Sequence, residues 1–69
     1  MSMHFFIIQL ECLGDFKLLK EHLEELEYTF TEDEEKKTLT LNSIGAFQFV
    51  EQFCETFDIR FTFWIAIRN

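Results

Sequence analysis

The hydrophobic positions near the start of the chain follow the pattern of a strand that is covered on both faces. Apolar residues fall on both sides of the alternation from Met3 to Cys12, with His4, Phe6, Ile8 and Leu10 on one side and Phe5, Ile7, Gln9 and Glu11 on the other. A strand in the middle of a sheet, buried on both faces, is typical of such a nearly continuous apolar run. We therefore expect a central strand here.

After the first strand the spacing of the apolar residues changes from every second position to that of a helix. Gly14 permits a sharp turn, and Asp15 is a residue type that caps helix N-termini. The apolar positions that follow are three and four residues apart, at Phe16, Leu19, Leu23 and Leu26. This spacing predicts an amphipathic helix that runs to about Glu27.

Two short alternating segments predict a hairpin. Tyr28 and Phe30 alternate with Thr29 and Thr31, and Leu39 and Leu41 alternate with Thr38 and Thr40 in the segment from Lys36 to Asn42. Aromatic and β-branched residues favour strands. The acidic run from Glu32 to Glu35 interrupts the alternation, so we expect these four residues to form the tip.

A second helix and a last strand complete the pattern. Asn42 and Ser43 are both good N-caps for a helix over residues 44 to 57, whose apolar stripe contains Ala46, Phe47, Phe49, Val50, Phe53, Cys54 and Phe57. After Asp58 the alternation predicts a half-buried strand of roughly ten residues. The face expected to be buried consists of Ile59, Phe61, Phe63, Ile65 and Ile67.

The order strand, helix, strand, strand, helix, strand is the signature of a ferredoxin-like βαββαβ sandwich in the α+β class. It predicts a four-stranded antiparallel sheet with two helices on one face, in which the first and third strands are central and the last lies beside the first. A chain of 69 residues buries only about 60% of the surface that its unfolded form exposes. We therefore expect residues 1–69 to form a single domain.

Charge changes this picture because it is unevenly distributed. The chain has 13 acidic residues against six Lys and Arg, a formal net charge of −7. This negative charge argues against direct binding to nucleic acid or to an anionic membrane, since proteins that bind phosphate groups normally carry a positive patch. The stretch from 21 to 35 has no Lys or Arg and holds eight of the acids: Glu21, Glu24, Glu25, Glu27, Glu32, Asp33, Glu34 and Glu35.

Two interpretations of these acids remain open. The first is a solvated face that keeps a Phe-rich protein soluble. The second is a surface that imitates the phosphate backbone of duplex DNA, whose charges lie about 3.4 Å apart along each strand. Carboxylates three or four residues apart on a helix are about 4.5 to 6 Å apart along its axis. The partner would then be a protein with a basic nucleic-acid-binding groove.

Helix stability alone does not explain the acidic pattern. Like charges at these spacings repel, and acids near a helix C-terminus oppose its dipole. We expect Lys17 and Lys20 to pair with Glu21 and Glu24, which would leave the second half of the helix and the hairpin tip without local counter-ions.

This short acidic chain with an α+β core opens with MSMHFFIIQLECLGDF and contains the runs EHLEELE and EDEE. In these features it resembles the small phage-borne anti-CRISPR proteins, several of which act as DNA mimics. The resemblance covers the size and character of the whole chain. It implies a non-enzymatic inhibitor whose target is a Cas protein or complex in the cytoplasm of the host cell. It also implies that the eight acids are the contacts.

The sheet face away from the helices is the second candidate surface. We expect it to display Phe5, Ile7, Thr38, Thr40, Thr62, Trp64 and Ala66, flanked by Arg60 and Arg68. The apolar patch of Phe5, Ile7 and Trp64 fits a partner or homodimer interface, unless neighbouring side chains cover it. A monomer and a weak homodimer are both compatible with this pattern. The third strand, KKTLTLN, has no aromatic residue on which RNA bases could stack.

A different functional class remains as the alternative. Gly14 lies between the first strand and the first helix. In this feature the chain resembles the ligand-binding regulatory modules of the same fold, such as ACT domains. That resemblance implies a regulatory or dimerisation module that uses the open sheet face to bind a partner or a small ligand.

The remaining residues predict no catalytic group, metal site or cofactor. His4 and His22 have no Cys or Ser at a spacing typical of a catalytic pair. Gly14 and Gly45 are too isolated to form a phosphate-binding loop. The acidic run lacks the ligand spacing of a calcium-binding loop. Cys12 and Cys54 are too few for a disulfide framework or a zinc site, so we expect reduced core thiols. No apolar run approaches the ~20 residues of a membrane span, and the first residues lack signal-peptide character, so we expect a cytoplasmic protein.

Overall fold

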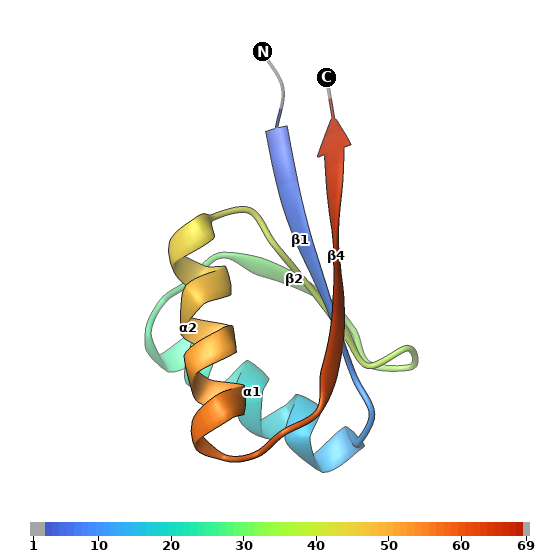
Figure 1. Ribbon diagram of the computed structural model, residues 1–69, viewed down its shortest axis with the longest axis vertical. Coiled ribbons are helices and arrows are strands. Elements are labelled where there is room, and N and C mark those ends of the chain that lie inside the picture. The colour runs from blue at the N-terminus through green and yellow to red at the C-terminus, as the bar shows by residue number, and fades with distance from the viewer. Residues whose placement is uncertain (1–2, 69) are drawn as a thin grey trace.

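Two helices pack on one face of a four-stranded antiparallel sheet in the computed structural model, which describes residues 3–68 (Figure 1). The elements are β1 (Met3–Leu10), α1 (Leu13–Glu25), β2 (Phe30–Asp33), β3 (Thr38–Leu41), α2 (Ile44–Thr56) and β4 (Phe61–Arg68). The strand order β2-β3-β1-β4 places β3 and β1 in the centre and β4 beside β1. The expected ferredoxin-like βαββαβ architecture is confirmed.

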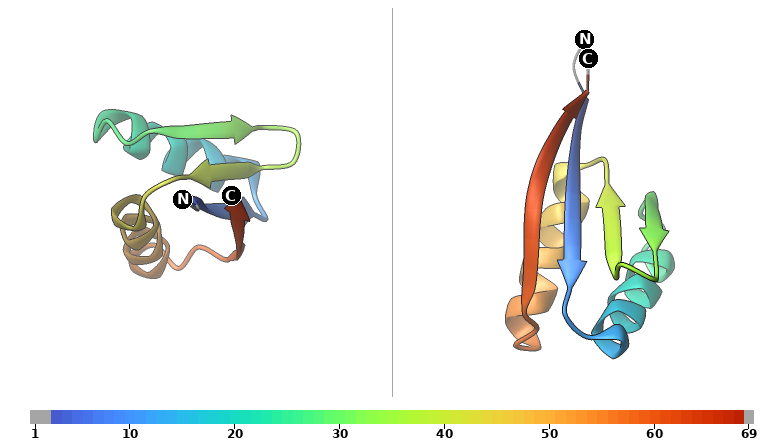
Figure 2. Two further views of the ribbon diagram at one scale, coloured as in Figure 1. Left: turned by 90° about the horizontal axis from the view of Figure 1, so that it is seen from above. Right: turned by 90° about the vertical axis from the view of Figure 1, so that its right-hand side faces the viewer.

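The core lies between the helices and the sheet face that they cover (Figure 2). Its buried residues are Phe6, Ile8 and Leu10 of β1, Leu39 and Leu41 of β3, Phe16, Leu19 and Leu23 of α1, and Ala46, Phe47, Val50, Phe53 and Cys54 of α2. Phe6 and Phe47 stack with their ring centroids 4.9 Å apart, which joins the central strand to α2. These are the positions at which the apolar period predicted burial.

The two helices begin differently. Ser43 is the N-cap of α2, as expected, and its hydroxyl oxygen accepts a hydrogen bond from the Ala46 N–H at 3.0 Å. The helix α1 begins at Leu13, three residues earlier than expected, and its N-cap residue Cys12 makes no side-chain capping bond. Asp15 is therefore not the cap. It lies in the first turn, where its charge still complements the helix dipole.

Both helices end in the same hydrogen-bonded motif. Glu27 adopts a left-handed conformation with φ of 62°, and the N–H of Tyr28 donates to the carbonyl of Leu23 at 3.0 Å. Asp58 (φ of 53°) occupies the equivalent position after α2. This motif stops a helix abruptly. Leu26 and Phe57, expected in the buried stripes, consequently lie beyond the last helical residues and are 53% and 56% exposed.

The hairpin turns later than the sequence predicted. Glu32 and Asp33 belong to β2, where they pair with Leu39 and Thr38, and the turn consists of residues 34–37. The Asp33 Oδ1 accepts a hydrogen bond from the Lys36 N–H at 3.2 Å, a local bond by which Asp residues initiate turns. The expected tip at residues 32–35 is therefore wrong in position, and the real turn contains two acids and two lysines.

The strands β1 and β4 extend beyond the rest of the sheet (Figures 1 and 2). They pair from Met3↔Arg68 to Leu10↔Phe61, whereas β3 pairs with β1 only over residues 6–9. An eight-residue strand is about 26 Å long and a 13-residue helix about 20 Å. The helices therefore do not cover the far end of this two-stranded ribbon.

The edge position of β4, together with this overhang, corrects the expectation for the last strand. The strand begins at Phe61 rather than Ile59. On the side expected to be buried, Phe63, Ile65 and Ile67 are instead 45%, 52% and 62% exposed.

Candidate functional site

One edge of the molecule gathers the acidic residues. The helix α1 lies against β2, the strand at one end of the sheet (Figure 2). All eight expected acids are exposed there, on α1, on the loop after it, on β2 and in the following turn. We call this surface the acidic edge, and its residues are Glu21, Glu24, Glu25, Glu27, Glu32, Asp33, Glu34 and Glu35.

Two lysines of α1 lie within the acidic edge and connect it to the hairpin. The Lys20 Nζ is 2.9 Å from the Glu32 Oε2, and the Lys17 Nζ is 3.8 Å from the Glu34 Oε1. The expected pairs within the helix, to Glu21 and Glu24, are not the ion pairs that form, and the hairpin does have counter-ions.

The geometry of the two elements explains this difference. Three residues along α1 rise about 4.5 Å, and two residues along β2 rise about 6.6 Å. Lys17 and Lys20 can therefore both meet hairpin carboxylates two residues apart, because α1 packs alongside β2. No local spacing in the sequence reveals such a contact.

Lys20 shows that the acids of the helix and of the hairpin share one electrostatic surface. Its hydrogen bond to Glu32 raises the pKa of the ammonium, against some desolvation, and the charge of Glu32 adds to the increase. The charges of Glu24 and Glu34 raise this pKa further. One ammonium thus responds to carboxylates from two elements.

The acidic edge retains a net negative charge after its lysines are counted. From residue 17 to residue 37 there are eight acids and four lysines, so the balance is 4 − 8 = −4 out of a total of −7. Within residues 3–68, six of the eight acids take part in no ion pair: Glu21, Glu24, Glu25, Glu27, Asp33 and Glu35. These six carboxylates are the unpaired negative charges of the acidic edge.

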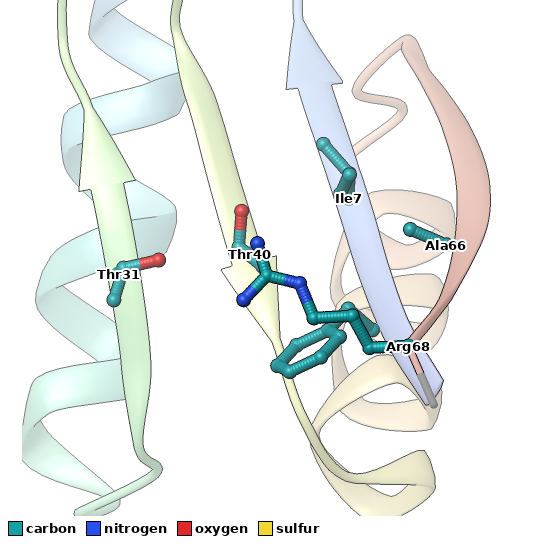
Figure 3. Close-up of a pocket in the computed structure, with 6 residues that line it drawn as sticks. Ile7, Thr31, Thr40, Ala66 and Arg68 are labelled. Atoms are coloured by element: carbon teal, nitrogen blue, oxygen red, sulfur yellow. The ribbon is translucent and has the colours of Figure 1, made fainter. Parts of the chain in front are cut away.

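The open sheet face forms the second surface. The register places Ile7 between Thr40 and Trp64, and Phe5 opposite Ala66, so the expected residues do share this face. Phe5 and Ile7 are half-buried, whereas Trp64 is exposed. A shallow hollow of about 350 Å³ is lined by Phe5, Ile7, Thr31, Thr40, Ala66 and Arg68 (Figure 3).

Arg68 gives this hollow its only charged group among the lining residues. Its guanidinium carbon lies 5.9 Å from the centroid of the Phe5 ring, a cation–π distance, and the side chain extends across the hollow towards Thr40 (Figure 3). Trp64 does not line the hollow. Thr31 does, and the sequence reasoning missed it because its contribution depends on the pairing of Thr31 with Thr40 in the edge strand.

The other residues singled out from the sequence have structural surroundings. The centroids of the His22 and Phe53 rings lie 4.8 Å apart. The His22 Nδ1 lies 2.9 Å from the carbonyl oxygen of Leu18, and because a carbonyl oxygen can only accept, this nitrogen is the hydrogen-bond donor. His4 is exposed on β1. In the part of the chain that the structure describes, no three His, Cys, Asp or Glu residues converge to hold a metal ion. None of the helices over residues 3–68 has the length and apolar character needed to cross a membrane.

The two cysteines are free and differ in environment. Cys54 is buried among the core residues of α2, as expected, and burial raises the pKa of its thiol to about 11, with a further contribution from the charge of Asp15. Cys12 is exposed just before α1, so its assignment to the core is wrong. Gly14 lies inside the first turn of α1 and does not have a positive φ, so its expected role in a sharp turn is also wrong.

The acidic edge and the open sheet face are thus the two surfaces on which a function can rest. Both are assembled from separate elements of the chain: α1 with the hairpin, and β1 with β2, β3 and β4. No model of a known protein family matches the chain, and no curated protein is significantly similar to it.

Proposed function

We propose that the protein is a non-enzymatic inhibitor that mimics double-stranded DNA and binds, through its acidic edge, to the basic nucleic-acid-binding site of another protein. The observation that carries this proposal is the packing of α1 against β2, which gathers eight exposed acids on one edge. Competition would be steric and electrostatic, with association accelerated by charge and weakened by salt.

The density of unpaired charge supports the comparison with DNA. Six carboxylates of the edge take part in no ion pair, and with Lys36 and Lys37 they leave a net charge of −4 along an edge whose helix is about 20 Å long, or about one net charge for every 5 Å. One strand of a duplex carries a charge about every 3.4 Å. A basic groove that holds one DNA strand would therefore meet a linear charge density of the same order.

Local stability does not account for the acids at the end of α1. Glu24 and Glu25 lie in the last turn, where negative charge opposes the helix dipole. Glu27 follows in a left-handed conformation that glycine adopts at lower cost. An acid at each of these positions is unfavourable for the helix and favourable for binding a basic partner.

The resemblance to small acidic anti-CRISPR proteins suggests one target class, a CRISPR-Cas complex in the cytoplasm of a phage-infected host. The charge argument extends to any other protein with a basic nucleic-acid-binding groove. We therefore state the partner by its chemistry, as a protein surface that binds DNA phosphates.

A matched pair of double variants tests the proposal. Glu24→Gln with Glu25→Gln removes two charges from the acidic edge, and Glu51→Gln with Glu55→Gln removes two exposed charges from α2. The probe is the DNA-binding protein recovered by pull-down from the native host, assayed by competition with duplex DNA at two salt concentrations. We expect the first variant to compete at least about tenfold more weakly and the second to match the wild type. Equal competition by all three proteins would show that mimicry is wrong.

The hollow on the open face favours a second candidate, a regulatory module of the ACT type. Its volume is at the lower end of the range of about 300 to 1,000 Å³ for small-molecule sites, and Arg68 would select an anionic ligand. A set of small carboxylates and phosphates, screened by thermal unfolding, should then include a compound that stabilises the wild type and not Arg68→Gln. If no compound distinguishes the two proteins, this candidate is excluded.

A further inference from the structure

The strand β4 is an unprotected edge of the sheet. It pairs with β1 on one side and with no other strand of the described chain. Edge strands in soluble proteins are usually short, charged, interrupted by Pro or covered. The opposite edge, β2, follows this rule, with four residues that include Glu32 and Asp33. β4 has eight residues, no Pro, and no acidic residue from Ile59 to Arg68.

The hydrogen bonds of the sheet show which backbone groups of β4 are free. The Leu10 N–H donates to the Lys37 carbonyl at 2.9 Å, so the even-numbered residues of β1 direct their backbone groups towards β3. In an antiparallel sheet this direction alternates, and the odd-numbered residues of β1 therefore bond to β4. Their partners in the register are residues 62, 64, 66 and 68. The N–H and C=O groups of Phe63, Ile65 and Ile67 consequently point away from the sheet.

The side chains of the same three residues are also uncovered. Phe63, Ile65 and Ile67 lie on the helix side of β4, and each is about half exposed, although the Phe63 ring also packs against Phe47 of α2 with their centroids 5.0 Å apart. Trp64 is 44% exposed on the other face. The strand thus combines free backbone groups with apolar side chains on both faces, which is what an added strand can cover.

We infer that β4 pairs antiparallel with β4 of a second copy of the chain, about a two-fold axis at Ile65, to form a continuous sheet. In this register Ile65 lies opposite Ile65, Phe63 of one copy opposite Ile67 of the other, and Trp64 opposite Ala66. Large side chains meet small or branched ones, and Thr62 lies opposite Arg68. The outward groups of residues 63, 65 and 67 form about six backbone hydrogen bonds.

Charge favours this register over the one with its two-fold axis at Trp64. A pairing of Phe63 with Ile65 of the other copy would also use the outward groups. It would place Arg60 directly opposite Arg68, however, and like charges in that position are destabilising. The axis at Ile65 avoids this contact.

A second copy fits this edge because β4 is complementary to itself in the register centred on Ile65 and carries no acid. Two chains of net charge −7 repel each other, and this repulsion is smallest where neither carries acids. β2 and β4 are at opposite ends of the sheet, so pairing through β4 keeps the two acidic edges farthest apart. Both acidic edges remain accessible, and the dimer does not depend on the function proposed for them.

Amide hydrogen exchange of the wild-type protein tests the register without any substitution. The amides of Phe63, Ile65 and Ile67 should exchange rapidly in dilute solution and become protected as concentration rises, in step with dimer formation measured by sedimentation. The amides of Thr62, Trp64 and Ala66 should be protected throughout, because they bond to β1. A monomer at all concentrations, or a dimer in which the three outward amides stay unprotected, would overturn the inference.

A charge at the axis provides a second test. Ile65→Lys places two like charges opposite each other and should raise the dimer Kd by at least about tenfold. Leu26→Lys is the control, because it adds the same charge at a residue of equal exposure, 53% against 52%, far from β4. An equimolar mixture of Ile65→Lys and Ile65→Glu should restore a 1:1 dimer in native mass spectrometry. A dimer that Ile65→Lys does not weaken would contradict the pairing, and so would a mixture that stays monomeric although both variants are folded.

Discussion

The Lys20 ammonium lies 2.9 Å from the Glu32 carboxylate and joins the middle of α1 to the edge strand β2. The two residues are twelve positions apart and belong to segments that the sequence presents as separate acidic runs. Their contact turns these runs into one surface, because Lys20 also responds to the charges of Glu24 and Glu34. The lysine neutralises part of the negative charge of the acidic edge and at the same time holds α1 beside the hairpin.

We expect Lys20→Gln to bind a basic partner more tightly and with a steeper dependence on salt. The substitution changes the formal net charge from −7 to −8 and releases the Glu32 carboxylate. Association rates at two ionic strengths would measure this effect. If the variant associates more slowly than the wild type, the pair itself, rather than the free charge, is what the partner recognises.

The same pair predicts a direction for stability at alkaline pH. The pKa of Lys20 is raised above its ordinary value of 10.5, so the contribution of the pair is complete below that pH and is lost as the pH rises through the folded-state pKa. The difference in the free energy of unfolding between wild type and Lys20→Gln should therefore decrease in strongly alkaline solution. Urea unfolding at neutral and alkaline pH measures it, and a difference that grows with pH would contradict this assignment.

The sequence predicted the elements because burial repeats with their period. Leu39 and Leu41 are buried and Thr38 and Thr40 half-buried, as the alternation of β3 requires. The ends of elements are set differently, by single hydrogen bonds such as that from the Lys36 N–H to Asp33, which no periodicity reveals. This is why the hairpin turn was expected two residues too early.

The two candidate surfaces were predictable to different degrees. The eight acids and the open-face residues were identifiable from composition and alternation, but the ion pairs of Lys17 and Lys20 arise only when α1 packs on β2. The exposure of Ile65 and Ile67 depends on the relative lengths of strand and helix in space. Neither relationship is encoded in a local pattern.

Gly14→Ala should stabilise the protein. Gly14 lies within α1 without a positive φ, and an added Cβ would be 3.7 Å from the Cys12 Sγ, an ordinary contact distance. Alanine in a helix is more favourable than glycine by about 0.5 to 1 kcal/mol. Urea unfolding should show an increase in the free energy of unfolding near the lower end of this range, because Gly14 is in the first turn of the helix. A loss of stability would indicate that Gly14 has a role that its backbone conformation does not show.

The two cysteines should differ sharply in reactivity. At neutral pH iodoacetamide should modify the exposed Cys12 and leave Cys54 intact, since burial raises the pKa of the Cys54 thiol to about 11 and blocks access to it. Mass spectrometry of the native and the urea-unfolded protein would show one and two modifications. Two modifications in the native protein would mean that the α2 core opens readily.

The raised pKa of Cys54 also predicts alkaline destabilisation. The folded state keeps the thiol protonated, and the unfolded state releases the proton from about the ordinary value of 9.0 upwards. The free energy of unfolding should therefore fall as the pH rises from about 9 to about 11. Cys54→Ala should be less stable at neutral pH because of the cavity, but its stability should fall less steeply over this interval. Equal slopes for the two proteins would contradict the assignment.

Replacement of Glu27 by glycine separates stability from binding at the acidic edge. Glu27→Gly relieves the left-handed strain at φ of 62° and removes an acid from the C-terminus of α1, so we expect the free energy of unfolding to rise by about 0.5 to 1 kcal/mol. The same variant should bind a basic partner more weakly, because one of the six unpaired charges is lost. Asp58→Gly is the control, since Asp58 has the same conformation after α2 (φ of 53°) and does not belong to the acidic edge. It should gain stability and keep its affinity. Equal loss of affinity in both variants would show that binding responds to total charge rather than to this edge.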